Sequence, residues 1–361
     1  MINVTKPNLP PLEEYVGIIK GIWDRNWLTN NGPLVNELEL RLKEYLDVKH
    51  ILYLNNGTIA LQFAFKALDL TPNSEIITTP FSFIATTSSI VWEGFKPVFV
   101  DIDENTLNIN PDLIEASITE HTTAILATHV FGNPCNIDAI DKIAKKHKLK
   151  VIYDAAHCFG TKYKGRSVFE FGDISTTSFH ATKLFHTIEG GAVFTQNPEL
   201  LKKMSYMRNF GYNGPEDFEC VGLNGKNSEF HAAMGLCNLP LVDDILKNRK
   251  KLSLIYNSYL ESTGILKFSI QKDAEFNFAY YPILLDNEQQ VTELIAELNG
   301  NHIYPRRYFY PSLNTVKYSG NQSANVSEKI SKQILCLPLY YNMTKEDVNF
   351  VSRIVLRTLK Y

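Results

Sequence analysis

The sequence has few of the features that mark disulfide-rich, metal-binding or nucleic-acid-binding proteins. Its five cysteines are scattered and form no Cys-x-x-Cys pair. This argues against a disulfide framework or a structural zinc site, and it fits a reducing compartment. We expect all five to be small buried hydrophobic residues. The 36 basic residues are balanced by 39 acidic residues, so the chain lacks the basic surplus of a nucleic-acid-binding protein.

Targeting and membrane segments are also lacking. No apolar run approaches the roughly 18–20 residues that a membrane helix needs. The N-terminal stretch Met1-Ile-Asn-Val-Thr-Lys-Pro-Asn-Leu-Pro-Pro has no apolar core of a signal peptide. The sequence therefore predicts a cytoplasmic protein with no membrane and no nucleic-acid partner.

Several catalytic and cofactor motifs are absent as well. No Gly-x-Gly-x-x-Gly follows a predicted strand, which argues against a dinucleotide-binding dehydrogenase. There is no Gly-x-Ser-x-Gly and no His-Glu-x-x-His, and the nine histidines show no ligand spacing, so no metal site is predicted. The stretch Gly160–Ser167 resembles a Walker A loop, but Arg166 stands where Lys is required, and its flanks favour a hairpin.

What the chain does contain is a regular alternation of strand-like and helical segments. At 361 residues, two domains are the first expectation. Between residues 50 and 154, short β-rich runs alternate with helical stretches, which predicts an α/β fold with a mostly parallel sheet and helices on both faces. Such sheets bind ligands at the carboxyl ends of their strands.

The C-terminal part has a different pattern. Residues 228–261 read as one long helix that is broken or kinked near Pro240. We place the domain boundary in this helix, with a large domain over 13–246 and a smaller C-terminal α/β domain over 247–361. Residues 1–12 are proline-rich and are expected to be extended. We expect this segment to pack on one of the two domains, and we choose the C-terminal domain.

Two candidate site residues or motifs follow predicted strands of the large domain. Asn55-Asn56-Gly57-Thr58 ends a strand and opens a helix, so its free N–H groups and helix dipole favour a phosphate. A plain turn with Thr58 as N-cap is the alternative, and taken alone it is the more frequent case. Asp154 ends the strand Val151-Ile-Tyr, where a partly desolvated carboxylate needs a cation, unless it only caps the next turn.

Two further candidates complete a pattern. Lys183 follows Ser178-Phe-His-Ala-Thr in a mostly apolar segment, which favours a lowered pKa and Schiff-base chemistry over a solvated surface lysine. Phe83 follows another strand end, where a ring could stack on a flat ligand, although most such phenylalanines are core residues. A phosphate site, an acid for a pyridinium, a Schiff-base lysine and a stacking ring are together what pyridoxal phosphate (PLP) requires.

The chain is similar over nearly its whole length to the sugar-nucleotide aminotransferases of the DegT/DnrJ/StrS family, which have the fold-type I PLP-dependent architecture of aspartate aminotransferase. The resemblance is carried by an ordered series of stretches: Trp27-Leu-Thr-Asn-Asn-Gly-Pro33, Asn56-Gly-Thr-Ile-Ala-Leu61, Asp154-Ala-Ala-His157, Ser178-Phe-His-Ala-Thr-Lys183, Glu189-Gly-Gly191, Arg208-Asn-Phe-Gly211, Gly222-Leu-Asn224, Leu337-Pro-Leu339 and Thr344-Lys-Glu-Asp-Val348.

The resemblance implies a role for each matched residue. Lys183 would form the Schiff base, Asp154 would face the pyridine nitrogen, and His157 would lie near the ring hydroxyl. The remaining cofactor contacts would be made by Gly57, Thr58, Ser178 (phosphate), Phe83 (ring) and Asn224, which in the family reaches the phosphate of the neighbouring subunit and so implies a homodimer with shared active sites.

The residues that contact the substrate are implied less directly than those that contact the cofactor. We expect Thr29, Lys226, Arg306 and Arg307 to contact substrate, the two arginines as cations for a diphosphate; a solvated basic turn is the alternative for the arginine pair. The family often has Gly-x-Asn-Tyr-Arg where this chain has Gly222-Leu-Asn-Gly-Lys226. Lysine keeps the charge but lacks the planar fork that makes a bidentate contact.

The resemblance also indicates a reaction. The Phe-His-x-x-Lys and Glu-Gly-Gly stretches resemble the members that aminate C4. Within that group, the longer stretches Trp27–Pro33 and Phe179–Gly191 resemble the members that form viosamine nucleotides for O-antigen and other cell-surface polysaccharides. The expected substrates are dTDP-4-keto-6-deoxyglucose and L-glutamate, and the expected product is dTDP-4-amino-4,6-dideoxyglucose. An aminotransferase that acts at C3 or gives the 4-epimer, and a non-catalytic PLP-binding regulatory protein, are the alternatives.

Overall fold

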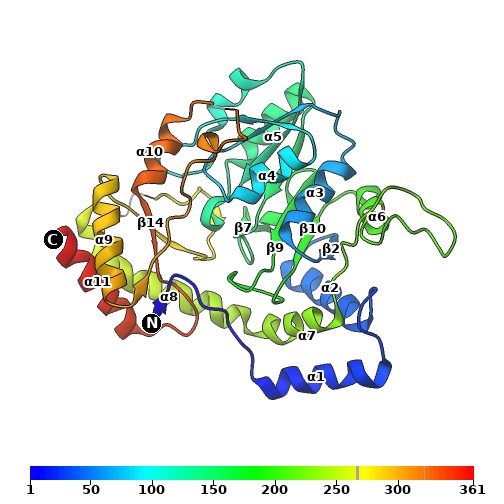
Figure 1. Ribbon diagram of the computed structural model, residues 1–361, viewed down its shortest axis with the longest axis horizontal. Helices are drawn as coiled ribbons and strands as arrows, with labels where there is room; N and C mark the ends of the chain where they lie inside the picture. The colour runs from blue at the N-terminus through cyan, green and yellow to red at the C-terminus, as the bar shows by residue number, and fades with distance from the viewer. Residues whose placement is uncertain (266–267, 321) are drawn as a thin grey trace.

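A computed structural model describes residues 1–265, 268–320 and 322–361 of the chain. Its centre is a seven-stranded sheet in the order β2-β10-β9-β6-β5-β3-β4 (Figure 1). All pairings are parallel except those of β10, which runs antiparallel to both neighbours. The strands are β2 (Ile51–Leu54), β3 (Glu75–Thr78), β4 (Lys96–Phe99), β5 (Thr122–Thr128), β6 (Lys150–Asp154), β9 (Ile174–Ser178) and β10 (Gly191–Phe194). The predicted mostly parallel sheet is confirmed.

Helices cover both faces of this sheet, because successive strand residues point to opposite sides. On one face, Tyr53 and Tyr153 pack in a core with α2 (Pro33–Leu46), α5 (Ile137–His147) and α7 (Glu229–Asn238). On the other face, Leu54 and Ile152 pack with α3 (Gly57–Ala67), α4 (Ile84–Trp92) and α6 (Pro198–Met207). Helix α1 (Leu12–Arg25) lies along α7 at the outside (Figure 1).

The long helix expected over 228–261 consists of three pieces. Helix α7 ends at Asn238, a 3₁₀ turn spans Leu239–Leu241, and α8 runs over Val242–Leu260. The break coincides with Pro240, which has no N–H to donate and so interrupts the helical hydrogen bonds. The break near Pro240 is therefore confirmed, whereas the domain boundary at residue 246 stays a prediction.

The C-terminal elements have their own core. Residues of α8 such as Leu252 and Tyr256 pack there with Ile283, Val291 and Val351. These come from the antiparallel pair β12 and β14 and from two of the three helices in this region. The elements are β12 (Tyr281–Leu284), α9 (Glu288–Gly300), α10 (Asn325–Gln333), β14 (Ile334–Leu337) and α11 (Lys345–Leu359).

The N-terminal segment links the two parts of the chain. Strand β1 (Ile2–Asn3) pairs in parallel with β13 (Ile303–Tyr304), and the Val4 carbonyl accepts a hydrogen bond from the Leu339 N–H. Further along, the Asn8 carbonyl lies 2.7 Å from Nε2 of His186, in the loop between β9 and β10. The segment therefore starts on the C-terminal elements and crosses to a loop of the central sheet, and the N-terminus lies near α8 and α11 in Figure 1.

A small three-stranded sheet tests the prediction made for the Walker-like stretch Gly160–Ser167. The Walker-like stretch forms the hairpin of β7 (Lys162–Tyr163) and β8 (Arg166–Ser167), with β11 (Ala274–Glu275) as third strand. Between β4 and β5 the chain forms two 3₁₀ turns, Pro111–Leu113 and Glu115–Ser117. The hairpin is confirmed, so the Walker-like stretch does not have the strand-to-helix geometry of a phosphate-binding loop.

The cysteines are all free thiols, as expected, and all but the half-buried Cys220 are buried. Across the described ranges, no helix combines the length and apolarity required to cross a bilayer. The same residues contain no group of three or more His, Cys, Asp or Glu side chains that could hold a metal ion.

Candidate active site

A cavity of about 560 Å³ lies at the carboxyl edge of the central sheet. Its walls come from the ends of β5, β6 and β9, from the start of α3, and from the C-terminal part of the chain around residues 304–309. This is where parallel sheets bind ligands. It is lined by eight of the residues predicted from the sequence: Gly57, Thr58, Phe83, Asp154, His157, Ser178, Lys183 and Arg306.

The start of α3 forms a cradle for an anion. The Asn56 side chain accepts from the Ile59 N–H at 2.8 Å, and the Asn56 carbonyl accepts from the Ala60 N–H at 3.2 Å. Neither bond uses the N–H groups of Gly57 and Thr58, and these two groups have no acceptor among the described residues. Two free N–H groups at the positive end of a helix dipole fit a phosphate.

Two glycines allow the close packing around this cradle. A Cβ on Gly191 would lie 2.5 Å from the carbonyl carbon of Asn56 and 2.7 Å from the Gly57 nitrogen. A Cβ on Gly57 would lie 3.0 Å from Cβ of Ser178 at the end of β9. Larger residues would therefore push β10 or β9 away from the start of α3.

Asp154 ends β6 and is 7% exposed. Its Oδ2 accepts from the Thr86 hydroxyl at 2.7 Å, and its Oδ1 accepts from the Ala156 N–H at 3.2 Å. Burial raises the pKa of this carboxyl, and the two hydrogen bonds and nearby Lys183 oppose that shift. The side chain can thus supply a fixed negative charge at the cavity wall.

Lys183 lies in the loop that follows β9. Its ammonium group makes no hydrogen bond or ion pair with any residue that the structure describes. Burial lowers the pKa of this amine to about 8, although the charges of Asp154 and Cys158 act in the opposite direction. An unpaired amine with a lowered pKa facing a cavity is suited to act as a nucleophile and as a proton carrier.

His157 adds an uncharged imidazole to the cavity. Its ring stacks on Phe309 at 5.8 Å and packs on Tyr280 at 4.7 Å between centroids. Burial lowers its pKa well below the usual range, so the ring is neutral near neutral pH. Its Nδ1 is buried and lacks a partner among the described residues, which is the pattern expected when a ligand supplies the missing hydrogen bond.

Phe83 is 55% exposed although it lines the cavity. An exposed phenylalanine ring beside a cradle, a carboxylate and an amine is available to stack on a flat ligand. The cradle, Asp154, Lys183, His157 and Phe83 therefore fit PLP in charge, polarity and shape.

The two neighbouring arginines have different surroundings. Arg306 lines the cavity, with its guanidinium 5.8 Å from the ring centroid of Tyr308, and has no acidic partner among the described residues. Arg307 does not line the cavity; it pairs with Glu288 at 2.8 Å and stacks on Tyr310 at 3.4 Å. Only Arg306 is thus available to an anion bound in this cavity.

Three other predicted residues lie outside the cavity of the same chain. Asn224 is exposed, and its carbonyl accepts from the Asn55 side chain at 3.1 Å. Lys226 donates to Asn209 Oδ1 at 2.7 Å, and the exposed Thr29 has its hydroxyl 3.5 Å from the Asn227 carbonyl.

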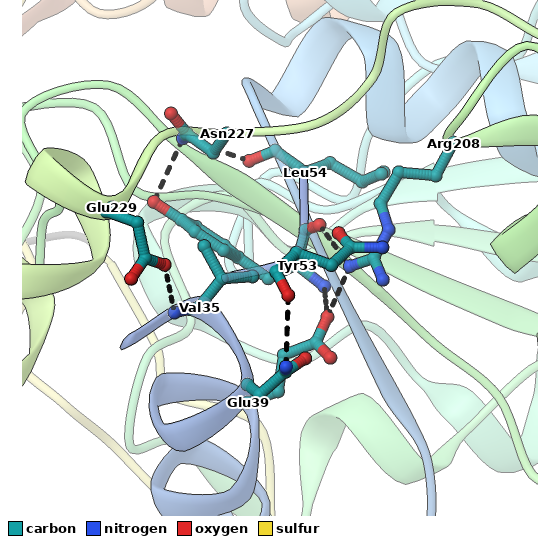
Figure 2. A network of polar contacts seen from close by, with 9 residues as sticks. Val35, Glu39, Tyr53, Leu54, Arg208, Asn227 and Glu229 are labelled. Carbon is teal, nitrogen blue, oxygen red and sulfur yellow. Dashed lines mark hydrogen bonds and ion pairs between the residues drawn. The ribbon is translucent and has the colours of Figure 1, made fainter. Parts of the chain in front are cut away.

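A buried polar network holds the elements beside the cradle (Figure 2). Glu39 accepts from the Tyr53 N–H at 2.7 Å and pairs with Arg208 at 2.6 Å. Arg208 also donates to the Tyr53 carbonyl at 3.0 Å, and the Asn227 amide donates to the Tyr53 hydroxyl at 2.9 Å. The network fixes β2, which leads directly into the cradle, against the loop that carries Asn224.

Glu229 extends this network to α2 (Figure 2). Its carboxylate is fully buried and accepts from the N–H groups of Leu34 and Val35, each at 3.0 Å. A carboxylate at a helix N-terminus satisfies free N–H groups and interacts favourably with the helix dipole. Neither Glu39 nor Glu229 stands out in the sequence, because both read as ordinary helix residues.

Sequence reasoning also missed several cavity-lining residues. His180 and Glu189 line the cavity 3.6 Å apart, and both lie in stretches that carry the family resemblance. Sequence reasoning did not single out the others. They include Asn3, Val4, Thr5, Ser82, Thr128, Tyr280, Tyr304, Tyr308 and Phe309.

Two curated proteins are similar to this chain over almost its full length. The dTDP-4-amino-4,6-dideoxy-D-glucose transaminase of Shigella dysenteriae is 43% identical over 357 residues, covering 97% of each chain. The protein of the same name from Escherichia coli is 39% identical over 368 residues, covering 98% of each.

The fold has a close counterpart among solved structures. DesI, crystallised in the presence of its TDP-sugar product, superposes with a TM-score of 0.91 at 29% identity, covering 99% of this chain and 93% of DesI. Residues 13–356 match the DegT/DnrJ/EryC1/StrS aminotransferase family. The chain therefore belongs to this family of PLP-dependent sugar aminotransferases, as its cavity and its fold both indicate.

Proposed function

We propose that the protein transfers the amino group of L-glutamate to C4 of dTDP-4-keto-6-deoxyglucose. The product would be dTDP-4-amino-4,6-dideoxyglucose, the viosamine nucleotide, for use in O-antigen or another cell-surface polysaccharide. The observation that carries the proposal is the agreement between the cavity and the relatives: a PLP-type cavity with a free cation at its rim, in a chain about 40% identical to two transaminases named for this product.

In this proposal the large-domain residues hold the cofactor. The N–H groups of Gly57 and Thr58 and the Ser178 hydroxyl bind the phosphate, Phe83 stacks on the ring, and the unpartnered Nδ1 of His157 is available near the ring hydroxyl. When bound, PLP supplies an electron sink that stabilises the charge released when a C–H bond next to the amine breaks. Asp154 holds a proton at the ring nitrogen.

In this proposal Lys183 acts as the general acid and base. Its amine would hold the cofactor covalently, and it would be free to carry a proton in the cavity while the amino donor occupies the cofactor. With a pKa of about 8, it can accept and return a proton near neutral pH, moving it between the two carbons that exchange hydrogen. Lys183 is half-buried in the cavity wall, which reduces the access of water to this step.

Arg306 is our choice for the cation that faces the diphosphate, because it lines the cavity and has no acidic partner among the described residues. Thr29, Lys226 and Arg307 stay predictions as substrate contacts. Asn224 also stays a prediction, as a residue that reaches the cofactor phosphate of a second subunit in a homodimer. Its exposed position on the loop beside the cradle is compatible with that role.

The test is a reaction of the purified protein with PLP, L-glutamate and dTDP-4-keto-6-deoxyglucose, with the product identified by NMR. We expect an equatorial amine at C4. An amine at C3, or the 4-epimer, would replace the proposed product with one of its alternatives. Binding of PLP without turnover on any keto sugar would favour a non-catalytic regulatory protein.

A further inference from the structure

Three buried hydroxyl groups form a chain that ends on Asp154. The Thr86 hydroxyl lies 2.7 Å from Oδ2 of Asp154, the Ser82 hydroxyl lies 2.7 Å from that of Thr86, and the Thr128 hydroxyl lies 3.0 Å from that of Ser82. All three residues are at most 4% exposed. Ser82 and Thr128 line the cavity, whereas Thr86 does not.

The direction of the protons in this chain follows from the carboxylate. An ionised carboxylate can only accept, so the Thr86 proton points to Asp154. Because each hydroxyl has a single proton, Thr86 must then accept from Ser82, and Ser82 must accept from Thr128. All three hydroxyl dipoles therefore align toward the negative charge, and aligned hydrogen bonds strengthen one another in a buried site.

We propose that the Thr128–Ser82–Thr86 chain keeps Asp154 ionised and aimed into the cavity, and that Thr86 is a positioning residue for the reaction. The inference rests on the proposed function, since it is there that Asp154 meets the ring nitrogen of PLP. Burial favours the neutral form of Asp154. In that form, the proton between Asp154 and the ring nitrogen of PLP would be bound to the carboxyl group and not to the ring. The hydroxyl chain counters this tendency.

The chain offers a matched control for Thr86. The next residue, Thr87, is fully buried on the same helix, and its hydroxyl has no partner among the described residues. Thr86→Val and Thr87→Val each replace a buried hydroxyl by a methyl group of the same shape. Only Thr86→Val removes the donor to Asp154, and Thr86→Ser restores that donor.

The experiment uses PLP labelled with ¹⁵N in the ring, bound to each variant without any sugar. The ¹⁵N chemical shift reports whether the ring nitrogen carries a proton. We expect Thr86→Val to shift the signal toward the unprotonated ring and to weaken PLP binding by roughly tenfold, the size expected for loss of a hydrogen bond to a charged group. Thr86→Ser and Thr87→Val should match the wild type.

One further variant, Ser82→Ala, keeps the test decisive. If Thr86→Val does not fold, Ser82→Ala should shift the signal in the same direction by a smaller amount. An unchanged nitrogen signal in Thr86→Val overturns the inference, as does an equal shift in Thr87→Val. If Thr86→Val does not fold, an unchanged signal in Ser82→Ala overturns it. A nitrogen shift without turnover of keto sugars would overturn the proposed substrate alone, whereas turnover with unchanged signals would overturn only the role of the hydroxyl chain.

Discussion

The Lys183 amine has an unusual position for a lysine, since it faces a cavity with no carboxylate bonded to it. Its pKa of about 8 leads to a prediction for the pH dependence of cofactor attachment. Only the neutral amine attacks a carbonyl, so the rate at which the apoprotein attaches PLP covalently should rise with pH and level off above about 8. Borohydride trapping across a pH series, with mass spectrometry of the Lys183 peptide, measures this rate.

The control for this measurement is Lys183→Ala, which should give no trapped peptide, and Lys162→Ala on the exposed hairpin strand β7, which should behave as wild type. A rate that keeps rising to the ordinary lysine range near pH ~10.4 would contradict the lowered pKa. It would mean that water solvates the amine more fully than its half-buried position implies.

Sequence reasoning works at the residue scale where chemistry and strand ends coincide. Asp154 and Lys183 are recognisable because they stand at or shortly after the ends of strands, whereas His157 is identified through the family resemblance. The structure places all three around one cavity. Arg306 and Arg307 could not be distinguished, because neighbouring residues in an extended chain point in different directions. Thr86 carries no signal at all, since hydroxyl residues are common in the first turn of a helix.

Strand β10 and helix α3 approach each other closely at Gly191, and this contact can be tested. Gly191→Ala adds a Cβ 2.5 Å from the Asn56 backbone. We expect the substitution to displace the start of α3, to weaken PLP binding by at least tenfold, and to cost about 1–3 kcal/mol of unfolding free energy. Titration of the apoprotein with PLP and urea denaturation measure the two effects.

The appropriate comparison is Gly165→Ala, because nothing lies within 4 Å of a Cβ at Gly165. Its positive φ gives a strain that is unrelated to crowding. If Gly165→Ala weakened PLP binding as much as Gly191→Ala, the close approach at the cradle would not be the cause.

The N-terminus of α2 depends on the buried Glu229 carboxylate (Figure 2). Glu229→Gln keeps the shape but replaces one acceptor oxygen by a donor that faces an N–H group. We expect a loss of about 1–3 kcal/mol in the free energy of unfolding. Glu37→Gln, on the exposed face of the same helix, should change it by less than about 0.5 kcal/mol. Equal midpoints in urea for the two variants would contradict the role of Glu229.

The elements themselves were predictable to different degrees. The strands of the sheet lie within about two residues of their predicted positions, because buried strands read as short apolar runs. No helix was assigned to α1, α2 or α6, whose apolar residues are spread among charged ones. These helices are stabilised by packing against elements that are distant in the sequence. Their own hydrophobic pattern is therefore a weak signal for a helix.

At the scale of the whole molecule, the proposed homodimer makes a prediction of its own. If Asn224 acts in the partner's site, Lys183→Ala and Asn224→Ala damage the same site from different subunits. A mixed dimer then contains one intact site. Unfolding and refolding the two variants together should restore about a quarter of the wild-type activity, as expected for random pairing in a two-fold dimer.

Each variant refolded alone provides the baseline for this mixture. Activity in the mixture no higher than the mean of the two separate samples would argue that Asn224 serves its own subunit. Light scattering on the wild-type protein gives the mass of the assembly independently.

The N-terminal segment has a consequence for how the cavity comes into being. Asn3, Val4 and Thr5 form part of the cavity wall, yet β1 is held by β13 and Val4 by Leu339, near the other end of the chain. Because these pairings join residues about 300 positions apart, we expect this part of the cavity wall to form late in folding. Residues fused ahead of Met1 would therefore lie close to the cavity wall, whereas Tyr361, which follows α11, does not line the cavity.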